Sequence, residues 1–251
     1  MVDPTLLQRM VAYAELNKDD IALEVGAGFG FLTRLLSEQC KKVIAVEVDP
    51  KLAQALCEQV KDSKNIELIE GDILETPVPA FNKVVSTPPY SISSPLLFWI
   101  LQRQFDLAVL TFQKEFAERL AAPVGSKEYS RLTVAIYYRA DVELLDCVPR
   151  TVFYPPPDVD SLVVRLKPKL KPPFRVKSEK AFSQLVQSVF TQRNKKLRNA
   201  IVSFLLKQGV VKDEAQKLAD SLTFHDKRVR ELAPEDFGAL TNEILEKTSA
   251  L

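Results

Sequence analysis

Histidine and cysteine are scarce in this chain of 251 residues, which contains one histidine and three cysteines. Cys40, Cys57 and Cys147 are far apart and form no Cys-x-x-Cys pair, so together with His225 they do not supply a zinc site. An odd number of cysteines also argues against a disulfide framework, in which cysteines pair. We therefore expect reduced, buried thiols, as in a cytoplasmic protein, and no bound metal.

Long apolar runs are absent as well. The sequence has no run of about 18 consecutive apolar residues, and its amino end lacks a charged segment followed by an apolar one. We therefore expect neither a membrane span nor secretion. Because 46% of the residues are hydrophobic, the chain can bury a core, and one domain with a smaller second domain is expected.

The sequence has almost no net charge, +1, but the charges are unevenly distributed. Residues 167–212 contain twelve lysines and arginines against a single acid, Glu179. A solvated surface usually mixes both signs, so this basic block predicts a polyanionic partner such as RNA.

Short apolar strands alternate with amphipathic helices over the first two thirds of the chain. This alternation predicts an α/β fold with a doubly wound, seven-stranded, mostly parallel sheet, whose last two strands pair antiparallel at one edge. Helices are expected near residues 31–39, 50–61, 93–103 and 113–121. The strands are expected at residues 21–25, 42–48, 66–72, 83–86, 107–112, 132–145 and 161–166.

A lysine- and proline-rich linker over residues 167–173 separates this sheet from a purely helical tail. Helical periodicity covers residues 178–207, 212–221 and 234–247, with no strand signal between them. We expect one domain over residues 1–168 and a small all-helical domain over residues 174–251.

Polar or flexible residues follow three successive predicted strands. Gly26 and Gly28 follow the first strand, where they permit a tight turn and close approach of a ligand to the backbone. Glu47 ends the second strand and Asp72 the third, and carboxylates there can accept ribose hydroxyls and an adenine amine. Since parallel strands place their carboxyl ends at one edge, the pattern predicts an adenosine-containing ligand at that edge.

The fourth strand runs into Thr87-Pro88-Pro89-Tyr90, which resembles the catalytic motif of enzymes that methylate exocyclic amines with S-adenosylmethionine. An adenine amine is a poor nucleophile, because its lone pair is delocalised into the ring. Oxygen acceptors at Thr87 and at the Pro88 carbonyl favour a more tetrahedral nitrogen in the transition state. Tyr90 offers an aromatic face on which the base can stack.

Nearly the whole chain resembles the ribosomal RNA adenine dimethyltransferase family. The resemblance implies a class I methyltransferase fold, S-adenosylmethionine as donor, and N6-dimethylation of adenines near the 3′ end of the small-subunit RNA during ribosome biogenesis. It is carried by "LEVGAGFGFLT", "VIAVEVD", "EGDIL", "VVSTPPYSISSPLLF", "QKEFAERL", "YSRLTVAI", "VFYPPPDVDSLVV" and "FTQRNKKLRNAI".

Roles for individual residues follow from the resemblance by position. Gly26 and the neighbouring Gly28 would hold the amino-acid part of the donor, Glu47 its ribose and Asp72 its adenine. Thr87, beside the donor, and Pro88 would bracket the target amine.

Two aromatic residues are assigned to the target base in the same way. Tyr90 would lie beside the flipped adenine, and Phe153 would stack on its opposite face. Packing of the last hairpin is an equally good interpretation of Phe153.

The basic stretch "QRNKKLRN" is expected on the first or second helix of the tail, where it would contact RNA phosphates. The contacting side chains would be Arg193, Lys195, Lys196 and Arg198. Lys167, Lys169 and Lys171 could extend the same track. We expect a monomer that binds ribosomal RNA in the immature small subunit.

The sequence departs from the family pattern in two places. The family has asparagine where this chain has Thr87, whose hydroxyl is a shorter acceptor. The family also has a Gly-Gln and phenylalanine segment, which helps to close the donor site, just before the position of Met1. Two alternatives therefore stay open: an RNA-binding assembly factor with weak or no methyl transfer, and an adenine methyltransferase acting on another RNA or on DNA.

Overall fold

The computed structural model describes residues 3–248. The chain divides into two compact units. The first runs from the amino end to Ala117 and adds Ala140–Pro168, and the second contains Glu118–Arg139 and the chain from Lys169 onward. Among residues 3–248, no helix is both long and apolar enough to cross a membrane.

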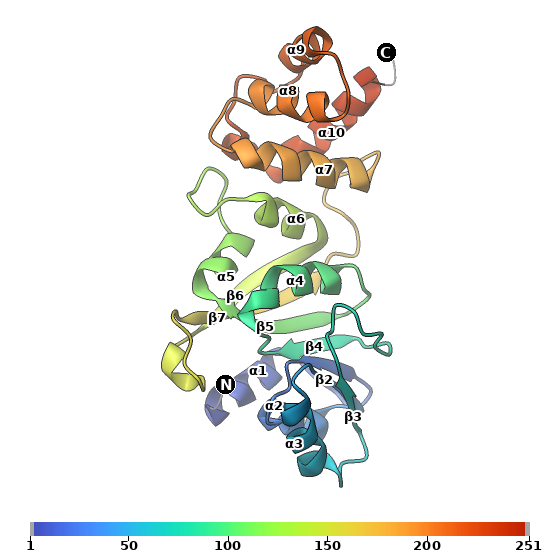
Figure 1. The fold of residues 1–251 in the computed structure, drawn as a ribbon, viewed down its shortest axis with the longest axis vertical. Coiled ribbons are helices and arrows are strands. Elements are labelled where there is room, and N and C mark those ends of the chain that lie inside the picture. Colours follow the sequence, from blue (N-terminus) through green and yellow to red (C-terminus); the bar gives the residue numbers. More distant parts are fainter. Residues whose placement is uncertain (1–2, 249–251) are drawn as a thin grey trace. The chain divides into compact units, whose positions relative to one another are not determined.

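The first unit contains one seven-stranded sheet, whose strand order is β3-β2-β1-β4-β5-β7-β6 (Figure 1). The strands from β1 to β5 pair in parallel, and β7 lies antiparallel between β5 and β6. This confirms the predicted sheet and its antiparallel edge. The strands are β1 (Ile21–Val25), β2 (Lys42–Glu47), β3 (Ile66–Glu70), β4 (Lys83–Ser86), β5 (Leu107–Gln113), β6 (Ala140–Val148) and β7 (Ser161–Pro168).

Helices follow β1, β2 and β4, as the alternation predicts, whereas β3 and β4 are joined without a helix. An additional helix, α1 (Pro4–Tyr13), precedes β1 and was not expected from the sequence. The Asp3 carboxylate accepts from the Thr5 and Leu6 amides and so caps α1, while Pro4 occupies its first turn. The other helices are α2 (Phe31–Gln39), α3 (Pro50–Val60), α4 (Ser93–Leu101) and α5 (Lys114–Leu120), with 3-10 turns at Tyr90–Ile92 and Arg150–Val152.

The strand predicted over residues 132–145 is wrong in its first half. Residues Arg131–Arg139 form helix α6, and only Ala140–Val148 form a strand. Leu132, Val134 and Ile136 alternate in sequence as they would in a strand. However, Val134 and Tyr138 lie four residues apart, on one helical face, and are buried in the core of the second unit. Packing of this face, rather than local alternation, decides the structure here.

The second unit is helical and contains α6 together with the tail (Figure 1). Its core gathers aromatic side chains such as Tyr129, Phe182 and Phe237, and the buried Tyr129 hydroxyl donates to the Leu232 carbonyl oxygen at 2.8 Å. The compact unit therefore takes in residues 118–139, which the sequence-based boundary places with the sheet. The tail helices are α7 (Glu179–Val189), α8 (Leu197–Lys207), α9 (Lys212–Asp220) and α10 (Pro234–Thr248), with 3-10 turns at Phe190–Gln192 and Val229–Glu231.

Candidate active site

The glycine turn after β1 packs against the proline exit from β4. Gly26 and Gly28 have φ values of +74° and +56°, and the Gly26 amide donates to the Val46 carbonyl at 2.8 Å. A Cβ atom on Gly26 would come within 3.0 Å of Pro89 Cδ. Only glycine therefore combines this backbone conformation with the close approach of the Pro88-Pro89 segment.

Ser86, the last residue of β4, holds the ends of β1 and β4 together. Its hydroxyl donates to the Val25 carbonyl oxygen at 2.6 Å and accepts from the Val25 amide at 3.2 Å. The backbone ladder between these strands pairs only Ala22 with Lys83 and Leu23 with Val84, so the Ser86 side chain extends the pairing to the carboxyl edge. Thr87 follows at this edge and is partly exposed.

Glu47 ends β2 as predicted, but it is buried: only 5% of the surface of the residue is exposed. One oxygen accepts from the Gly28 amide at 2.8 Å and the other from the Asp49 amide at 3.0 Å. These two bonds fix the carboxylate against the glycine turn. Each oxygen retains further lone-pair capacity for a ligand hydroxyl.

Asp72 lies just after β3, at the same edge of the sheet. Its carboxylate accepts from the Leu74 amide at 2.9 Å, and the preceding Gly71 amide donates to the Glu47 carbonyl oxygen at 2.9 Å. The ends of β2 and β3 are thereby joined, and the Asp72 side chain remains partly exposed.

Tyr90 and Phe153 meet edge to face rather than as parallel walls of a slot. Their ring centroids are 6.2 Å apart and the rings are inclined by 72°. The Tyr90 hydroxyl is hydrogen-bonded to the buried Ser161 hydroxyl at 2.5 Å. Burial raises the pKa of Tyr90 above its ordinary value, while the bond with Ser161 acts in the opposite direction. Tyr90 therefore stays neutral and is anchored to the start of β7.

A cavity of about 480 Å³ opens beside the glycine turn, a volume in the range of small-molecule sites. Of the predicted residues, Gly26, Gly28 and Thr87 line it; Glu47, Asp72, Pro88, Tyr90 and Phe153 are not among its lining residues. The sequence analysis missed the rest of the lining, which consists of Leu7, Glu24, Ala27, Phe29, Phe31, Leu32, Leu52 and Tyr154.

Glu24 is the most unusual residue of this lining. It lies within β1 and is 2% exposed, and its Oε2 atom has no hydrogen-bond partner among the described residues. Burial raises the pKa of this carboxyl to about 8, and the nearby Glu47 carboxylate adds to the shift. The signal in the sequence was an acid inside an otherwise apolar strand, "IALEV".

The glycine turn, the two carboxylates at neighbouring strand ends and Thr87 lie at one edge of the sheet. A family model described as ribosomal RNA adenine dimethylase matches residues 1–244. The chain belongs to this family. The predicted family, the methyltransferase activity and the donor S-adenosylmethionine are thereby confirmed.

Relatives and solved structures agree with this assignment. A protein of Methanosarcina mazei, named probable ribosomal RNA small subunit methyltransferase A, is 45% identical over 99% of this chain and 92% of its own length. A crystal structure of a dimethyladenosine transferase from Plasmodium falciparum is 31% identical, with a TM-score of 0.83 over 99% of this chain and 97% of that one. The 23S rRNA methyltransferase ErmE is 28% identical, with a TM-score of 0.72 over 96% and 97% of the two chains.

The residues of this methyltransferase fit S-adenosylmethionine. The Oε2 atom of Glu24 is an orphaned, buried acceptor at the cavity, suited to the ammonium group of the donor. A Cβ atom on Gly28 would meet nothing within 4 Å, so the turn leaves open space beside the backbone. Glu47 and Asp72 place carboxylates at the two neighbouring strand ends, where hydroxyls and an amine require acceptors.

The basic residues predicted to bind RNA do not share one helical face. Arg193, Lys195 and Lys196 lie in the turn between the 3-10 segment Phe190–Gln192 and α8, and only Arg198 lies on the helix. The helical periodicity over 178–207 is therefore interrupted at this turn, and the prediction that the basic stretch lies on a helix holds only for its end. The chain bends here because this turn pairs with residues 228–230. The Val229 amide donates to the Lys195 carbonyl oxygen and the Arg230 amide to that of Arg193, and Arg228 forms an antiparallel bridge with Lys196.

Two of these basic side chains meet on one carboxylate. Lys196 Nζ lies 2.7 Å and Arg198 Nη1 3.7 Å from the carboxylate of Asp226. Arg193 instead donates to the carbonyl oxygens of Ser126 and Lys127, at 3.2 and 2.8 Å. The structure thus brings Lys196 and Arg198 together, whereas Arg193 is bonded to the backbone at Ser126 and Lys127.

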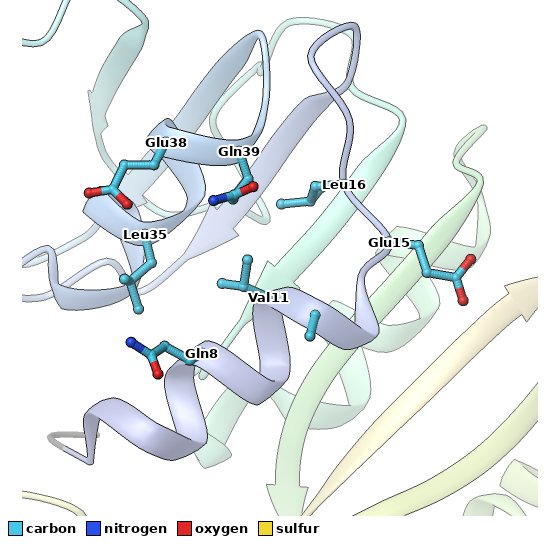
Figure 2. A pocket seen from close by; sticks show the side chains of 8 residues that line it. Gln8, Val11, Glu15, Leu16, Leu35, Glu38 and Gln39 are labelled. Atoms are coloured by element: carbon cyan, nitrogen blue, oxygen red, sulfur yellow. The ribbon is translucent and has the colours of Figure 1, made fainter.

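A second cavity, of about 390 Å³, lies between α1 and α2 and contains none of the predicted residues. Figure 2 shows Val11, Leu16 and Leu35 on its inner side, with Gln8, Glu38 and Gln39 around them. Its α2 residues belong to the carboxyl-terminal half of that helix, whereas Gly28 and Phe31 of the donor cavity lie at its amino end. It is therefore distinct from the active site.

Proposed function

We propose that this methyltransferase dimethylates the N6 atoms of adenines near the 3′ end of small-subunit ribosomal RNA during ribosome biogenesis. Thr87 carries the proposal, because the Ser86–Val25 hydrogen bonds hold it beside the glycine turn at the donor cavity. The name of the Methanosarcina mazei relative supports the small subunit as the source of the substrate. The proposal includes action as a monomer on the immature subunit, in the cytoplasm.

Donor binding is assigned to the carboxyl edge of β1, β2 and β3. Gly26 and Gly28 would hold the amino-acid part, Glu47 would accept the ribose hydroxyls and Asp72 would accept the adenine amine. The two amide bonds to Glu47 support this role, because they set the direction of its remaining lone pairs before the ligand arrives.

The bound donor supplies an electrophilic methyl group on a sulfonium. The protein contributes alignment: the Thr87 hydroxyl and the Pro88 carbonyl would accept from the two N–H bonds of the target amine and direct its lone pair toward the donor. The prolines support this role, because they restrict the backbone that carries the accepting carbonyl.

Tyr90 would stack on the target adenine, and its rigid setting supports this. Ser161 holds its hydroxyl and Phe153 contacts its ring edge to face. Stacking of Phe153 on the opposite face would require its ring to turn away from the edge-to-face contact with Tyr90, and an aromatic stack contributes about 1–3 kcal/mol per base.

RNA binding is assigned to the helical tail, residues 174–251, and donor binding to residues 1–168. Lys195, Lys196 and Arg198, with Arg193 nearby, would contact phosphates; the excess of basic residues over 167–212 supports this.

Transfer of tritium from labelled donor to under-methylated small subunits tests the function, with mass spectrometry of the digested RNA to identify dimethyladenosine. Incorporation into the small-subunit RNA is the expected result. Tight binding to these subunits without incorporation would favour an assembly factor. Incorporation only into large-subunit RNA or naked DNA would assign another substrate.

A further inference from the structure

Three large aromatic side chains stand exposed at the mouth of the donor cavity. The residues Phe29, Phe31 and Tyr154 have exposed fractions of 51%, 42% and 84%. All three line the same cavity as Thr87. Single exposed apolar residues are common on proteins, but three aromatic rings around one cavity form a patch, and such patches mark binding surfaces.

Tyr154 and its neighbour Phe153 have different surroundings. The backbone at Phe153 is extended, with φ −105° and ψ 152°, and successive side chains of an extended segment point in opposite directions. Phe153 is partly buried against the sheet core and contacts Tyr90. Tyr154 faces solvent and the cavity. One loop thus carries an inner ring close to Tyr90 and an outer ring at the entrance.

Phe29 and Phe31 come from another part of the chain, the glycine turn and the first residue of α2. Their ring centroids are 6.5 Å apart, and the Arg34 guanidinium lies 5.7 Å from the Phe31 ring. Flat rings with one adjacent cation are suited to nucleobases, which stack on aromatic faces irrespective of sequence.

None of these rings is among the contacts assigned to the donor or to the target base. The amino-acid part of the donor is assigned to Gly26 and Gly28, its adenine to Asp72, which is not a lining residue of this cavity, and the target adenine to Tyr90. The rings instead surround the entrance next to Thr87, where an RNA strand must pass if its extruded base is to reach that residue.

We propose that Phe29, Phe31 and Tyr154 form an outer stacking rim that binds the nucleotide adjacent to the target adenine. This inference rests on the proposed function, because it takes Thr87 as the position of the target amine. The rim would hold the strand while the target base is extruded, and would thereby offset part of the cost of unstacking.

Steady-state methylation of under-methylated small subunits tests the rim. Tyr154→Ala should raise KM for the subunits roughly 10- to 100-fold, the range that loss of one aromatic stack predicts. Tyr154→Phe keeps the ring and should behave like wild type, and so should Val159→Ala, a control in the same loop. Donor affinity, measured by calorimetry, should not change in Tyr154→Ala. Phe29→Ala should repeat the KM pattern.

The outcomes separate this inference from the proposed function. If the wild-type protein does not methylate the subunits, the proposed function fails. If wild type is active and Tyr154→Ala has an unchanged KM, or loses donor affinity instead, the rim proposal is overturned.

Ultraviolet crosslinking locates the contact. Trypsin should release residues 151–165 as one peptide, and fragmentation can distinguish a nucleotide on Tyr154 from one on Phe153. A crosslink from Tyr154 to a neighbour of the dimethylated adenine supports the rim. A crosslink from Tyr154 to the target adenine itself overturns it.

Discussion

The Ser86 hydroxyl is hydrogen-bonded to both backbone groups of Val25, at the point where two parallel strands end side by side. Because Gly26 follows Val25 and Thr87 follows Ser86, this side chain joins the glycine turn to the residue proposed to accept the target amine. If Thr87 has that role, the alignment of the donor with its acceptor depends in part on a buried serine that is assigned to neither of them.

Ser86→Ala should impair both stability and alignment. Two bonds to the buried backbone are lost, and we expect the free energy of unfolding to fall by about 1–3 kcal/mol. Methyl transfer should slow more than donor binding weakens. Urea unfolding and single-turnover kinetics measure the two effects. Ser203→Ala, which removes a hydroxyl that donates to the Asn199 carbonyl oxygen in an exposed bond of α8, is the matched control and should change neither. A fully active Ser86→Ala enzyme would contradict the role of Ser86 in alignment.

Glu24 should make the stability of the unliganded protein depend on pH. Burial raises its pKa from 4.5 to about 8, so between these values the unfolded chain ionises while the folded protein keeps the proton. The free energy of unfolding should therefore fall as the pH rises from 4.5 to 8, at about 1.4 kcal/mol per pH unit, and level off above.

Glu24→Gln should remove this dependence, and urea titrations at several pH values would measure it. The variant should gain stability relative to wild type at pH 8 and show little gain at pH 4.5. Glu38→Gln, a change at an exposed carboxylate, serves as the control. Parallel pH profiles of wild type and Glu24→Gln would contradict a buried, protonated Glu24.

Thr87 offers a direct test of the amine-accepting role. Thr87→Val keeps the shape but removes the acceptor, and we expect kcat to fall by about 100-fold, as for other single positioned groups. Donor affinity should change little. Thr87→Ser should retain most activity, and Thr87→Asn should be at least as active as wild type, because its carbonyl oxygen is an acceptor that cannot rotate into a donor. Rapid-quench measurement of the methyl-transfer step reports the comparison, and a Thr87→Val enzyme with the wild-type rate would exclude this role.

Glu47→Gln should weaken donor binding far more than RNA binding. The carboxylate accepts from the Gly28 and Asp49 amides, and a side-chain amide can replace only one of these acceptors. We expect a loss of donor affinity of about 10-fold or more, measurable by calorimetry, with unchanged binding to small subunits. Equal losses for both ligands would count against separate donor and RNA sites.

Asp226 should restrain the RNA affinity of the helical tail. Its carboxylate binds Lys196 and lies near Arg198, and the hydrogen bond with Lys196 holds its pKa below the usual value, so it stays charged at neutral pH. Asp226→Asn should tighten binding to small subunits a few-fold at low salt and steepen the salt dependence. Lys196→Glu should do the reverse. Filter binding over a series of salt concentrations gives both slopes, and identical slopes would remove Lys196 from the RNA site.

The sheet and the residues that gather at its carboxyl edge were predictable from local sequence. Apolar runs separated by amphipathic helices predicted a doubly wound sheet of seven strands, with the exception of the helix at Arg131–Arg139, whereas the order of the strands came from the structure. Glycines, carboxylates and prolines at successive strand ends indicated the site, since parallel strands necessarily bring these ends to one edge.

The state of individual side chains was decided only by tertiary structure. Neither the protonated Glu24 nor the difference between the inner Phe153 and the outer Tyr154 follows from residue type. Arg131–Arg139 became a helix, and the basic stretch became a turn, because of partners distant in sequence. Local patterns fix which backbone a segment prefers, whereas burial and hydrogen-bond partners come from contacts that exist only once the chain has folded.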